Sequence, residues 1–278
     1  MPPNSTTGKA IDQIPRRIAE NNTETSIVAL FMAGIIPGII LTTSLGIYSL
    51  WINRHIPRKP FAASVLFSAI RRGIWSMALP VVLLGGIYSG LFSPTEAAVV
   101  SLAYALFVEL VIHRELEMKD FYATLKSTAQ MLGTLFPIIA VALSIKTLLA
   151  IEGIPEDFSL WLQDTVTSKV TFLLAVNLSL ILIGCLIDVI SAILLLEPLL
   201  FVATQAFGIH PVHFGIIMII NLEIGLLTPP IGLNLLVALT AFKQKFSEIC
   251  IAVLPFMAVM SAVLLLITFV PQLSLWLL

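Results

Sequence analysis

The apolar run from Phe214 to Phe242 is long enough to cross a lipid bilayer, yet two consecutive prolines interrupt it near its centre. Neither Pro229 nor Pro230 can donate a backbone N–H, and each ring clashes with the carbonyl four residues earlier. The residue before a proline is also pushed out of helical geometry. The sequence therefore predicts two half-helices that meet at Thr228, Pro229 and Pro230.

This break matters because backbone groups without hydrogen-bond partners are costly in hydrocarbon unless protein surrounds them or they line a hydrated cavity. Secondary transporters build ion and substrate sites at helices that are broken in mid-membrane. A proline kink that serves only packing is the alternative interpretation. The combination of Thr228, two prolines, Gly232 and Asn234 favours a binding site.

The composition of the chain is that of a membrane protein. Of its 278 residues, 58% are hydrophobic and 11% are charged, whereas soluble domains are about 25% charged. The mean hydropathy is +1.03. We therefore predict an all-α polytopic membrane protein, embedded in a lipid bilayer. The net charge of −1 does not suggest a nucleic-acid partner, and Cys185 and Cys250 lie in apolar runs as expected of small core residues.

The N-terminal part of the chain divides into a tail and a membrane region. Residues 1–25 are polar, match no recognisable motif and are expected to form a loose tail, whereas residues 26–150 are expected to form scaffold-like transmembrane helices. A basic loop after the first span is predicted to be cytoplasmic, because Lys and Arg accumulate on that side. The basic residues of the tail would then lie outside, so the orientation stays open. The loop contains Arg54, Arg58, Lys59, Arg71 and Arg72.

The segment Ser93-Pro94-Thr95-Glu96 has the composition of a helix start. Ser93 is a good N-cap, Pro94 suits the first helical turn, and Glu96 at the third position completes a capping box. A cap explains a carboxylate at this spacing. We therefore favour that role for Glu96 over the alternative role of an ion ligand.

Residues 170–207 form a second long apolar stretch with a polar centre. Two complete spans fit this stretch, and so does a re-entrant hairpin of two shorter arms with its tip near Asp188. An ionised aspartate at bilayer depth is costly and persists only if it is paired, protonated or exposed to a wet cavity. Asp188 is therefore the best single candidate for a cation ligand, the alternative being a carboxylate exposed at an outer turn.

Other polar side chains in or beside the apolar segments allow more than one role. Lys146 is expected to extend to the lipid headgroups at the end of its span. Glu197 and Glu223 are either protonated and packed or part of the transport pathway. His210 and His213 lack the spacing of a zinc site and a third ligand, so we expect them to be loop residues.

Four blocks of the sequence resemble, in the same order, motifs of the large membrane subunit of TRAP (tripartite ATP-independent periplasmic) transporters. The blocks are Phe31–Gly38, Gly85–Ala98, Gly208–Met218 and Gly225–Asn234. The resemblance implies the elevator fold of the ion-transporter superfamily and sodium-coupled uptake of an organic acid, such as a C4-dicarboxylate or a sialic acid. It also implies a bacterial or archaeal inner membrane and two partners, a small membrane subunit and a periplasmic solute-binding protein.

The resemblance also assigns roles along the second half of the chain. Residues 151–246 would form half of a transport domain, with an interfacial helix, the hairpin 170–207 and the broken helix 211–242. Residues 247–278 would form a C-terminal transmembrane helix. The hairpin tip and the helix break would hold one sodium ion, the only cofactor implied, through oxygen atoms. The site residues are, for sodium, Gly184, Asp188, Thr228, Pro229 and Gly232, and, for the substrate cavity, Ser191, Pro230 and Asn234.

The chain departs from the family in length. Family members contain two inverted repeats, each with a hairpin and a broken helix, whereas this sequence contains one of each and resembles the C-terminal half only. Either a separate polypeptide supplies the other half, or the chain is a truncated remnant that does not transport. We do not expect an enzyme, because no Ser/His or Asp/Asp pair is evident at membrane depth. The sequence does not identify the substrate.

Overall fold

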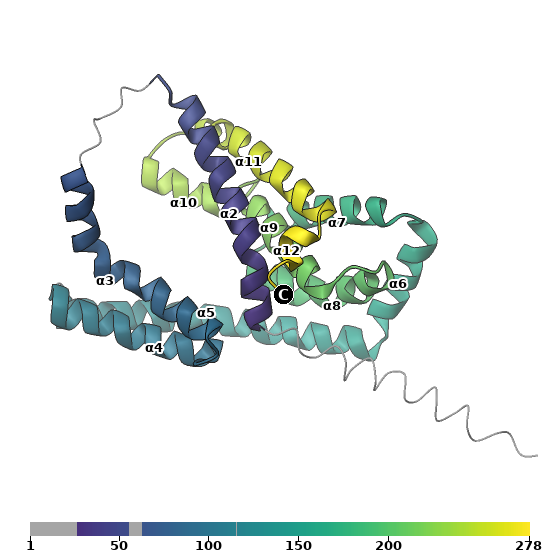
Figure 1. Ribbon diagram of the computed structural model, residues 1–278. Helices are drawn as coiled ribbons and strands as arrows, with labels where there is room; N and C mark the ends of the chain where they lie inside the picture. The colour runs from purple at the N-terminus through teal and green to yellow at the C-terminus, as the bar shows by residue number, and fades with distance from the viewer. Residues whose placement is uncertain (1–26, 56–62, 115) are drawn as a thin grey trace, which may run out of the picture.

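The computed structural model describes residues 27–55, 63–114 and 116–278, and all regular structure within these ranges is helical (Figure 1). The expected polar tail and the basic residues Arg58 and Lys59 lie outside the described residues. The helices are α2 (Ile27–Ile52), α3 (Ala63–Tyr88), α4 (Pro94–Phe107), the π-helix η1 (Val108–His113), α5 (Met118–Ile151), α6 (Ile154–Thr165), α7 (Lys169–Gly184), α8 (Val189–Ala206), α9 (Pro211–Leu226), α10 (Leu233–Phe242), α11 (Phe246–Phe269) and α12 (Gln272–Leu275).

Five segments of the described chain are helical, long and apolar enough to cross a membrane. They are α2, α4 continued by η1, α5, α8 and α11. Several of these helices contain an internal proline, which membrane helices tolerate because neighbouring groups satisfy the freed carbonyls. The prediction of an all-α polytopic membrane protein is confirmed. The internal prolines of these helices are Pro37, Pro137, Pro198 and Pro255, and α3 contains another, Pro80.

Helices α3 and α4 pack against each other, and the turn between them contains the expected capping box. The backbone N–H of Glu96 donates to the Ser93 hydroxyl at 3.3 Å, and the backbone N–H of Ser93 donates to the Glu96 carboxylate at 2.8 Å. The capping role of Glu96 is therefore confirmed. Farther along the pair, the Tyr104 hydroxyl donates to the Trp75 carbonyl at 2.8 Å and ties the two helices together.

Two boundaries differ from the sequence-based expectation. Arg71 and Arg72 do not belong to a loop, because α3 begins at Ala63 and includes both residues. Similarly, α5 is one helix from Met118, although hydropathy alone places the start of this span after Lys126. The reason is the same in both cases. Hydropathy marks where a helix enters the apolar layer, whereas helical hydrogen bonding continues through the polar flank.

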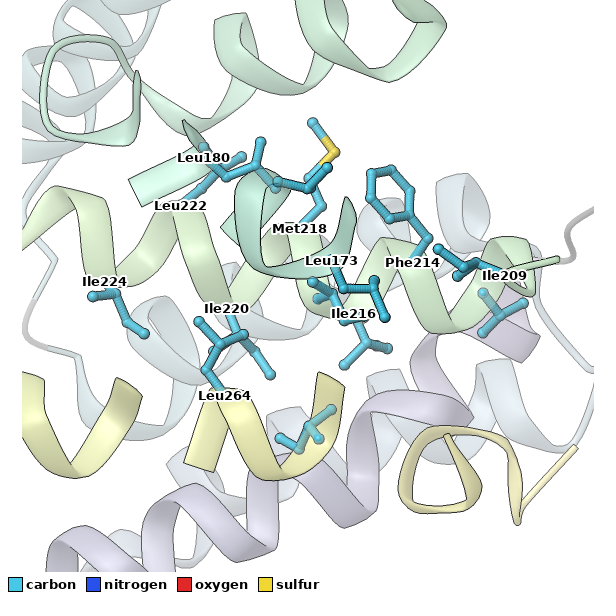
Figure 2. Close-up of a cluster of buried hydrophobic side chains, with 14 of the residues drawn as sticks. Leu173, Leu180, Ile209, Phe214, Ile216, Met218, Ile220, Leu222, Ile224 and Leu264 are labelled. Carbon is cyan, nitrogen blue, oxygen red and sulfur yellow. The ribbon is translucent and has the colours of Figure 1, made fainter. Parts of the chain in front are cut away.

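Helix α9 lies at the centre of the packed core. Most of its 16 residues are buried, and its contacts come from α7, α8, α11, α2 and α12. Figure 2 shows the apolar side chains of α9 lying between Leu173 and Leu180 of α7 and Leu264 of α11. Helix α9 thus stays within the core almost up to the residues that precede the prolines.

The helices before and after the predicted hairpin tip pack on different partners. Helix α7 lies mainly against α9, whereas α8 lies mainly against α6 and α5, and the two helices have few contacts with each other. Helix α7 has 16 residues and is about 24 Å long, shorter than a hydrocarbon core of about 30 Å. Helix α8, with 18 residues, is one of the five helices long and apolar enough to cross a membrane. The re-entrant hairpin therefore stays a prediction.

Candidate functional site

The helix break lies where the prolines predict it. Helix α9 ends at Leu226 and α10 begins at Leu233, so residues 227–232 separate the two half-helices. In a continuous helix the N–H groups of residues 229 and 230 would bond to the carbonyls of Gly225 and Leu226, four residues earlier. Proline has no N–H, so both carbonyls lose that donor.

Thr228 replaces part of the missing hydrogen bonding. Its backbone N–H donates to the Gly225 carbonyl at 2.8 Å, and its hydroxyl donates to the Ile224 carbonyl at 2.8 Å. The hydroxyl oxygen of Thr228 keeps lone pairs that are not used in this bond. Thr228 therefore closes the last turn of α9 and can still offer an oxygen to a ligand.

Gly232 brings two carbonyl oxygens of the break together. Its φ of +48° lies in the left-handed region, which favours glycine. A Cβ atom at this position would lie 2.9 Å from Leu235 Cδ1, 3.0 Å from the Thr228 carbonyl oxygen and 3.1 Å from the Leu226 carbonyl oxygen. The two oxygens therefore lie close to the same point beside Gly232, where a methyl group of Leu235 also packs and a side chain at position 232 would not fit.

The hairpin tip lies between α7 and α8, with Asp188 at its end. Asp188 is the N-cap of α8, and its carboxylate accepts a hydrogen bond from the backbone N–H of Ser191 at 3.0 Å. An N-cap aspartate satisfies one of the orphan donors of the first helical turn. The carboxylate thus has a structural partner, and a second oxygen that a carboxylate can offer to a cation.

The tip and the break are connected by one backbone hydrogen bond and one close helix crossing. The N–H of Gly232 donates to the Cys185 carbonyl at 3.3 Å. A Cβ atom at Gly225 would lie 2.7 Å from the Cα atom of Gly184, so α7 and α9 touch through their backbones. Because Gly184 has no side chain, α7 can cross α9 this closely, and the crossing holds the tip beside the break.

Pro229, Pro230 and Asn234 are exposed, whereas Ser191 is half-buried in the first turn of α8. The Ser191 side chain forms a further hydrogen bond with the Asp188 carboxylate, beside that of its backbone N–H. Among the described residues, no hydrogen bond joins the Pro229 or Pro230 ring or the Asn234 side chain to Asp188. The structure therefore connects the hairpin to the break through Cys185 and Gly232. The substrate-cavity set stays a prediction.

A buried polar network lies along α7, α9 and α11, and the sequence analysis did not identify it. The Asn221 amide donates to the Asn177 side-chain oxygen at 2.7 Å, and the Asn177 amide donates to the Thr268 hydroxyl at 3.2 Å. Asn221 is fully buried, and its own side-chain oxygen has no hydrogen-bond partner. Two asparagines in apolar helices were the available signal, since polar side chains at this depth commonly join helices.

The expectation that both histidines are loop residues is wrong for His213. His210 is the N-cap of α9, and its ring accepts from the backbone N–H of Val212. His213 is buried in α9, with ring nitrogens 3.2 Å from the Ser274 hydroxyl and 3.4 Å from the Thr268 carbonyl. These partners come from the end of the chain, so the local sequence did not indicate them.

The expectation that Lys146 extends to the headgroups is also wrong. Its ammonium lies 2.8 Å from the Glu197 carboxylate, which joins the end of α5 to the middle of α8. The two side chains are 43% and 40% exposed. In the ion pair the two charges neutralise each other, whereas either charge alone would be costly inside a bilayer.

The fold and the site define a polytopic membrane protein in which the turn between α7 and α8 meets a broken helix. Residues 17–273 match the family described as "Tripartite ATP-independent periplasmic transporter, DctM component". The chain belongs to this family, a family of transporters and not of enzymes. The family match begins at residue 17, so it includes the last part of residues 1–25, which were expected to match no known motif.

Three curated relatives illustrate the match. The C4-dicarboxylate TRAP transporter large permease protein DctM of Rhodobacter capsulatus is 39% identical over 90% of this chain and 58% of its own length. The sialic acid large permease SiaM of Vibrio cholerae is 36% identical over 90% of this chain and 60% of its own length. The 2,3-diketo-L-gulonate large permease YiaN of Escherichia coli is 35% identical over 89% of this chain and 59% of its own length. The chain therefore spans less than two thirds of these relatives.

Proposed function

We propose that the chain is one part of a TRAP-type secondary transporter that takes up an organic acid with sodium as the coupling ion. The observation that carries this proposal is the junction at Gly232. There the Cys185 carbonyl, before the predicted hairpin tip, accepts a hydrogen bond from the helix break, and two carbonyl oxygens of the break lie close to one point beside Gly232. Broken helices with such unwound carbonyls coordinate sodium ions in secondary transporters.

The proposed sodium ligands are oxygen atoms from both sides of this junction. Asp188 would contribute its second carboxylate oxygen, Thr228 its hydroxyl oxygen, and the backbone of residues 226–232 its carbonyls. Hard cations prefer such oxygen ligands. Pro229 takes part by removing a hydrogen-bond donor, and Gly184 and Gly232 by allowing close backbone approach.

The proposed substrate is an organic acid, and its carboxylate would lie near the start of α10. A helix N-terminus carries a partial positive charge that stabilises anions. Ser191, Pro230 and Asn234 would line this cavity. The named solutes of the relatives include C4-dicarboxylates, sialic acid and 2,3-diketo-L-gulonate, all of them acids.

The proposed partners are a small membrane subunit, a periplasmic solute-binding protein and a polypeptide that supplies the rest of the large permease, all at the inner membrane. One relative, the isethionate permease DctMQ of Oleidesulfovibrio alaskensis, matches this chain over 40% of its own length. The second candidate function is a truncated, non-transporting remnant or assembly subunit. The chain matches 58–60% of the length of other relatives, and a measurement of transport distinguishes the two candidates.

Uptake into proteoliposomes tests the proposal. The chain is reconstituted with the three partners and given radiolabelled C4-dicarboxylates or sialic acid under an inward sodium gradient or an equal potassium gradient. We expect uptake with sodium only. Absence of uptake with every partner combination, despite a correctly assembled complex, would favour the remnant.

The substitution Asp188→Ala should abolish sodium-dependent uptake, because it removes the only charged ligand proposed for the ion. Direct sodium binding, measured with 22Na+ on the purified complex, should fall in parallel. Asp164→Ala is the matched control, because Asp164 is an exposed aspartate of α6, away from the junction. Unchanged sodium dependence in Asp188→Ala would reject the assigned site.

A further inference from the structure

Ser191 donates two hydrogen bonds to one carboxylate, that of Asp188. Its backbone nitrogen lies 3.0 Å from Asp188 Oδ2, and its hydroxyl forms a second bond with the same carboxylate. The backbone bond alone completes the cap of α8, in which Asp188 precedes the helix and Ser191 lies in its first turn. The hydroxyl bond is therefore additional to what the cap requires.

Other hydroxyl groups in this part of the fold have a different kind of partner. Ser144 of α5 donates to the Ala140 carbonyl at 2.9 Å, and Thr204, on the same helix as Ser191, donates to the Phe201 carbonyl at 2.8 Å. Bonding to a carbonyl of the preceding turn is the usual choice for serine and threonine inside a helix. The Ser191 hydroxyl is bonded to a carboxylate instead.

Two donors on one residue restrict the rotation of the Asp188 carboxylate. The last torsion of an aspartate side chain is broad, so a carboxylate with a single hydrogen bond can still turn about it. A second donor, fixed to the same helical turn, removes much of this freedom. A carboxylate has two oxygens with several lone pairs, and those that Ser191 does not use remain for a cation.

The direction of the hydroxyl bond separates two roles for Ser191. An ionised carboxylate only accepts hydrogen bonds, so the Ser191 hydroxyl donates its single proton to Asp188. An organic acid also presents a carboxylate, which needs donors. While the hydroxyl is bonded to Asp188, Ser191 can line the substrate cavity but has no side-chain proton to donate to an acidic substrate.

Asp188 and Ser191 follow the stretch of backbone that meets the helix break. Cys185, three residues before Asp188, accepts the hydrogen bond from the Gly232 N–H at 3.3 Å, and Ser191 is half-buried. From this placement and the two hydrogen bonds, we infer that Ser191 is a positioning residue, which holds the Asp188 carboxylate in the orientation that binds the coupling ion. The affinity for the ion, and not that for the substrate, therefore depends on the Ser191 hydroxyl. The inference rests on the proposed function, because it takes Asp188 as a ligand of sodium.

Sodium binding by Ser191→Ala tests the inference. The substitution removes the hydroxyl and keeps the backbone N–H, so the cap should persist and the Tm should stay close to that of the unchanged chain. We expect the dissociation constant for 22Na+, measured on the full chain in mild detergent, to rise about tenfold, near the lower end of what a hydrogen bond to a charged group contributes. In proteoliposomes the half-saturating sodium concentration should rise by the same factor, whereas the substrate KM at saturating sodium should not change.

Two further variants separate positioning from a purely structural role. Ser191→Thr keeps a hydroxyl at this position and should restore most of the sodium affinity. Ser93→Ala removes another hydroxyl that donates to a carboxylate, that of Glu96 at 2.8 Å, in the cap of α4. Because α4 packs mainly on α3, this control weakens a helix cap away from the junction and should leave sodium binding unchanged.

Three outcomes would overturn the inference. The first is an unchanged 22Na+ dissociation constant in Ser191→Ala, or no sodium binding by the unchanged chain. The second is a raised substrate KM with unchanged sodium dependence, which would assign the hydroxyl to the substrate. The third is an equal loss of sodium affinity in Ser191→Ala and in either Ser191→Thr or Ser93→Ala.

The binding measurement needs neither the partners nor transport. Weaker 22Na+ binding in Ser191→Ala, together with no uptake by the assembled complex, would reject the proposed function and support the role of Ser191. Sodium-dependent uptake that Ser191→Ala leaves unchanged would support the proposed function and reject the role of Ser191. The two failures are therefore distinguishable.

Discussion

The two arms of the proposed hairpin differ in how they are held. Helix α7 touches α9 backbone to backbone at one crossing and has six buried residues, but half of its residues are exposed. Helix α8 has three buried residues, and almost all of the others are half-buried against α5, α6 and α9. The position of the tip therefore depends on one close crossing on the side of α7 and on side-chain contacts with three helices on the side of α8, the arm that Asp188 begins. We expect an adjustment of the tip around a bound ion to occur on the side of α8, because side-chain contacts yield more readily than a backbone crossing.

The largest effect is expected where α7 and α9 cross. In Gly225→Val the added side chain meets the backbone of Gly184, at 2.7 Å, and neither backbone can yield without moving its helix. We expect the free energy of unfolding to fall by about 3 kcal/mol, the upper part of the range for overpacking. Differential scanning fluorimetry in detergent gives the change in Tm.

Gly133→Val is the control for that prediction, because a Cβ atom at Gly133, on α5, meets no atom within 4 Å. The control should retain its Tm to within a few degrees. Equal loss of stability in both variants would show that the crossing is not special and would remove the contrast between the arms.

A smaller effect is expected in the buried polar network that holds the same arm. Asn221→Leu removes the donor to the Asn177 oxygen and leaves that oxygen buried without a partner. We expect a loss of about 1.5 kcal/mol, near the maximum measured for hydrogen bonds between membrane helices. The double variant Asn177→Leu/Asn221→Leu should cost less than the sum of the single variants, because neither oxygen remains to be satisfied.

Asn234→Leu is the matched stability control, since Asn234 is an exposed asparagine of α10. Its unfolding midpoint should stay close to that of the unchanged protein. Strict additivity of the two buried substitutions would contradict a direct interaction between Asn177 and Asn221.

What the sequence predicted correctly depended on local covalent chemistry. Two adjacent prolines cannot continue a helix, so the position of the break followed from Pro229 and Pro230 alone. The capping box at Ser93 and Glu96 was likewise contained in four consecutive residues. Asp188 was predicted to lie at the end of an arm. Its role as the N-cap of α8, through the hydrogen bond from the Ser191 backbone N–H, was not predicted, although an aspartate before a helix is a capping signal.

What the sequence did not reveal depended on residues far apart in the chain. Lys146 and Glu197 are separated by 51 residues, and His213 and Ser274 by 61. Each of these polar groups looked isolated in its own apolar segment. The contact of Gly184 with Gly225 also required the relative placement of two helices, which periodicity cannot supply.

The smallest effect is expected at the ion pair that holds α8. Lys146→Met leaves the Glu197 carboxylate without its partner, but both side chains are partly exposed, so we expect a loss of only about 0.5–1 kcal/mol in the free energy of unfolding. The change in hydrogen exchange within α8 should be easier to detect than the change in the free energy of unfolding. Hydrogen exchange should accelerate in residues 189–206 and stay unchanged in residues 169–184, because only α8 loses an attachment.

The charge-exchanged variant Lys146→Glu/Glu197→Lys distinguishes a pairing role from a general effect of either side chain. It rebuilds an ion pair between α5 and α8 and should restore slow exchange in residues 189–206. Faster exchange in both arms of Lys146→Met would mean that α7 and α8 move as one unit. The different packing of the two arms would then have no dynamic consequence, and the adjustment around Asp188 would have to be assigned to the hairpin as a whole.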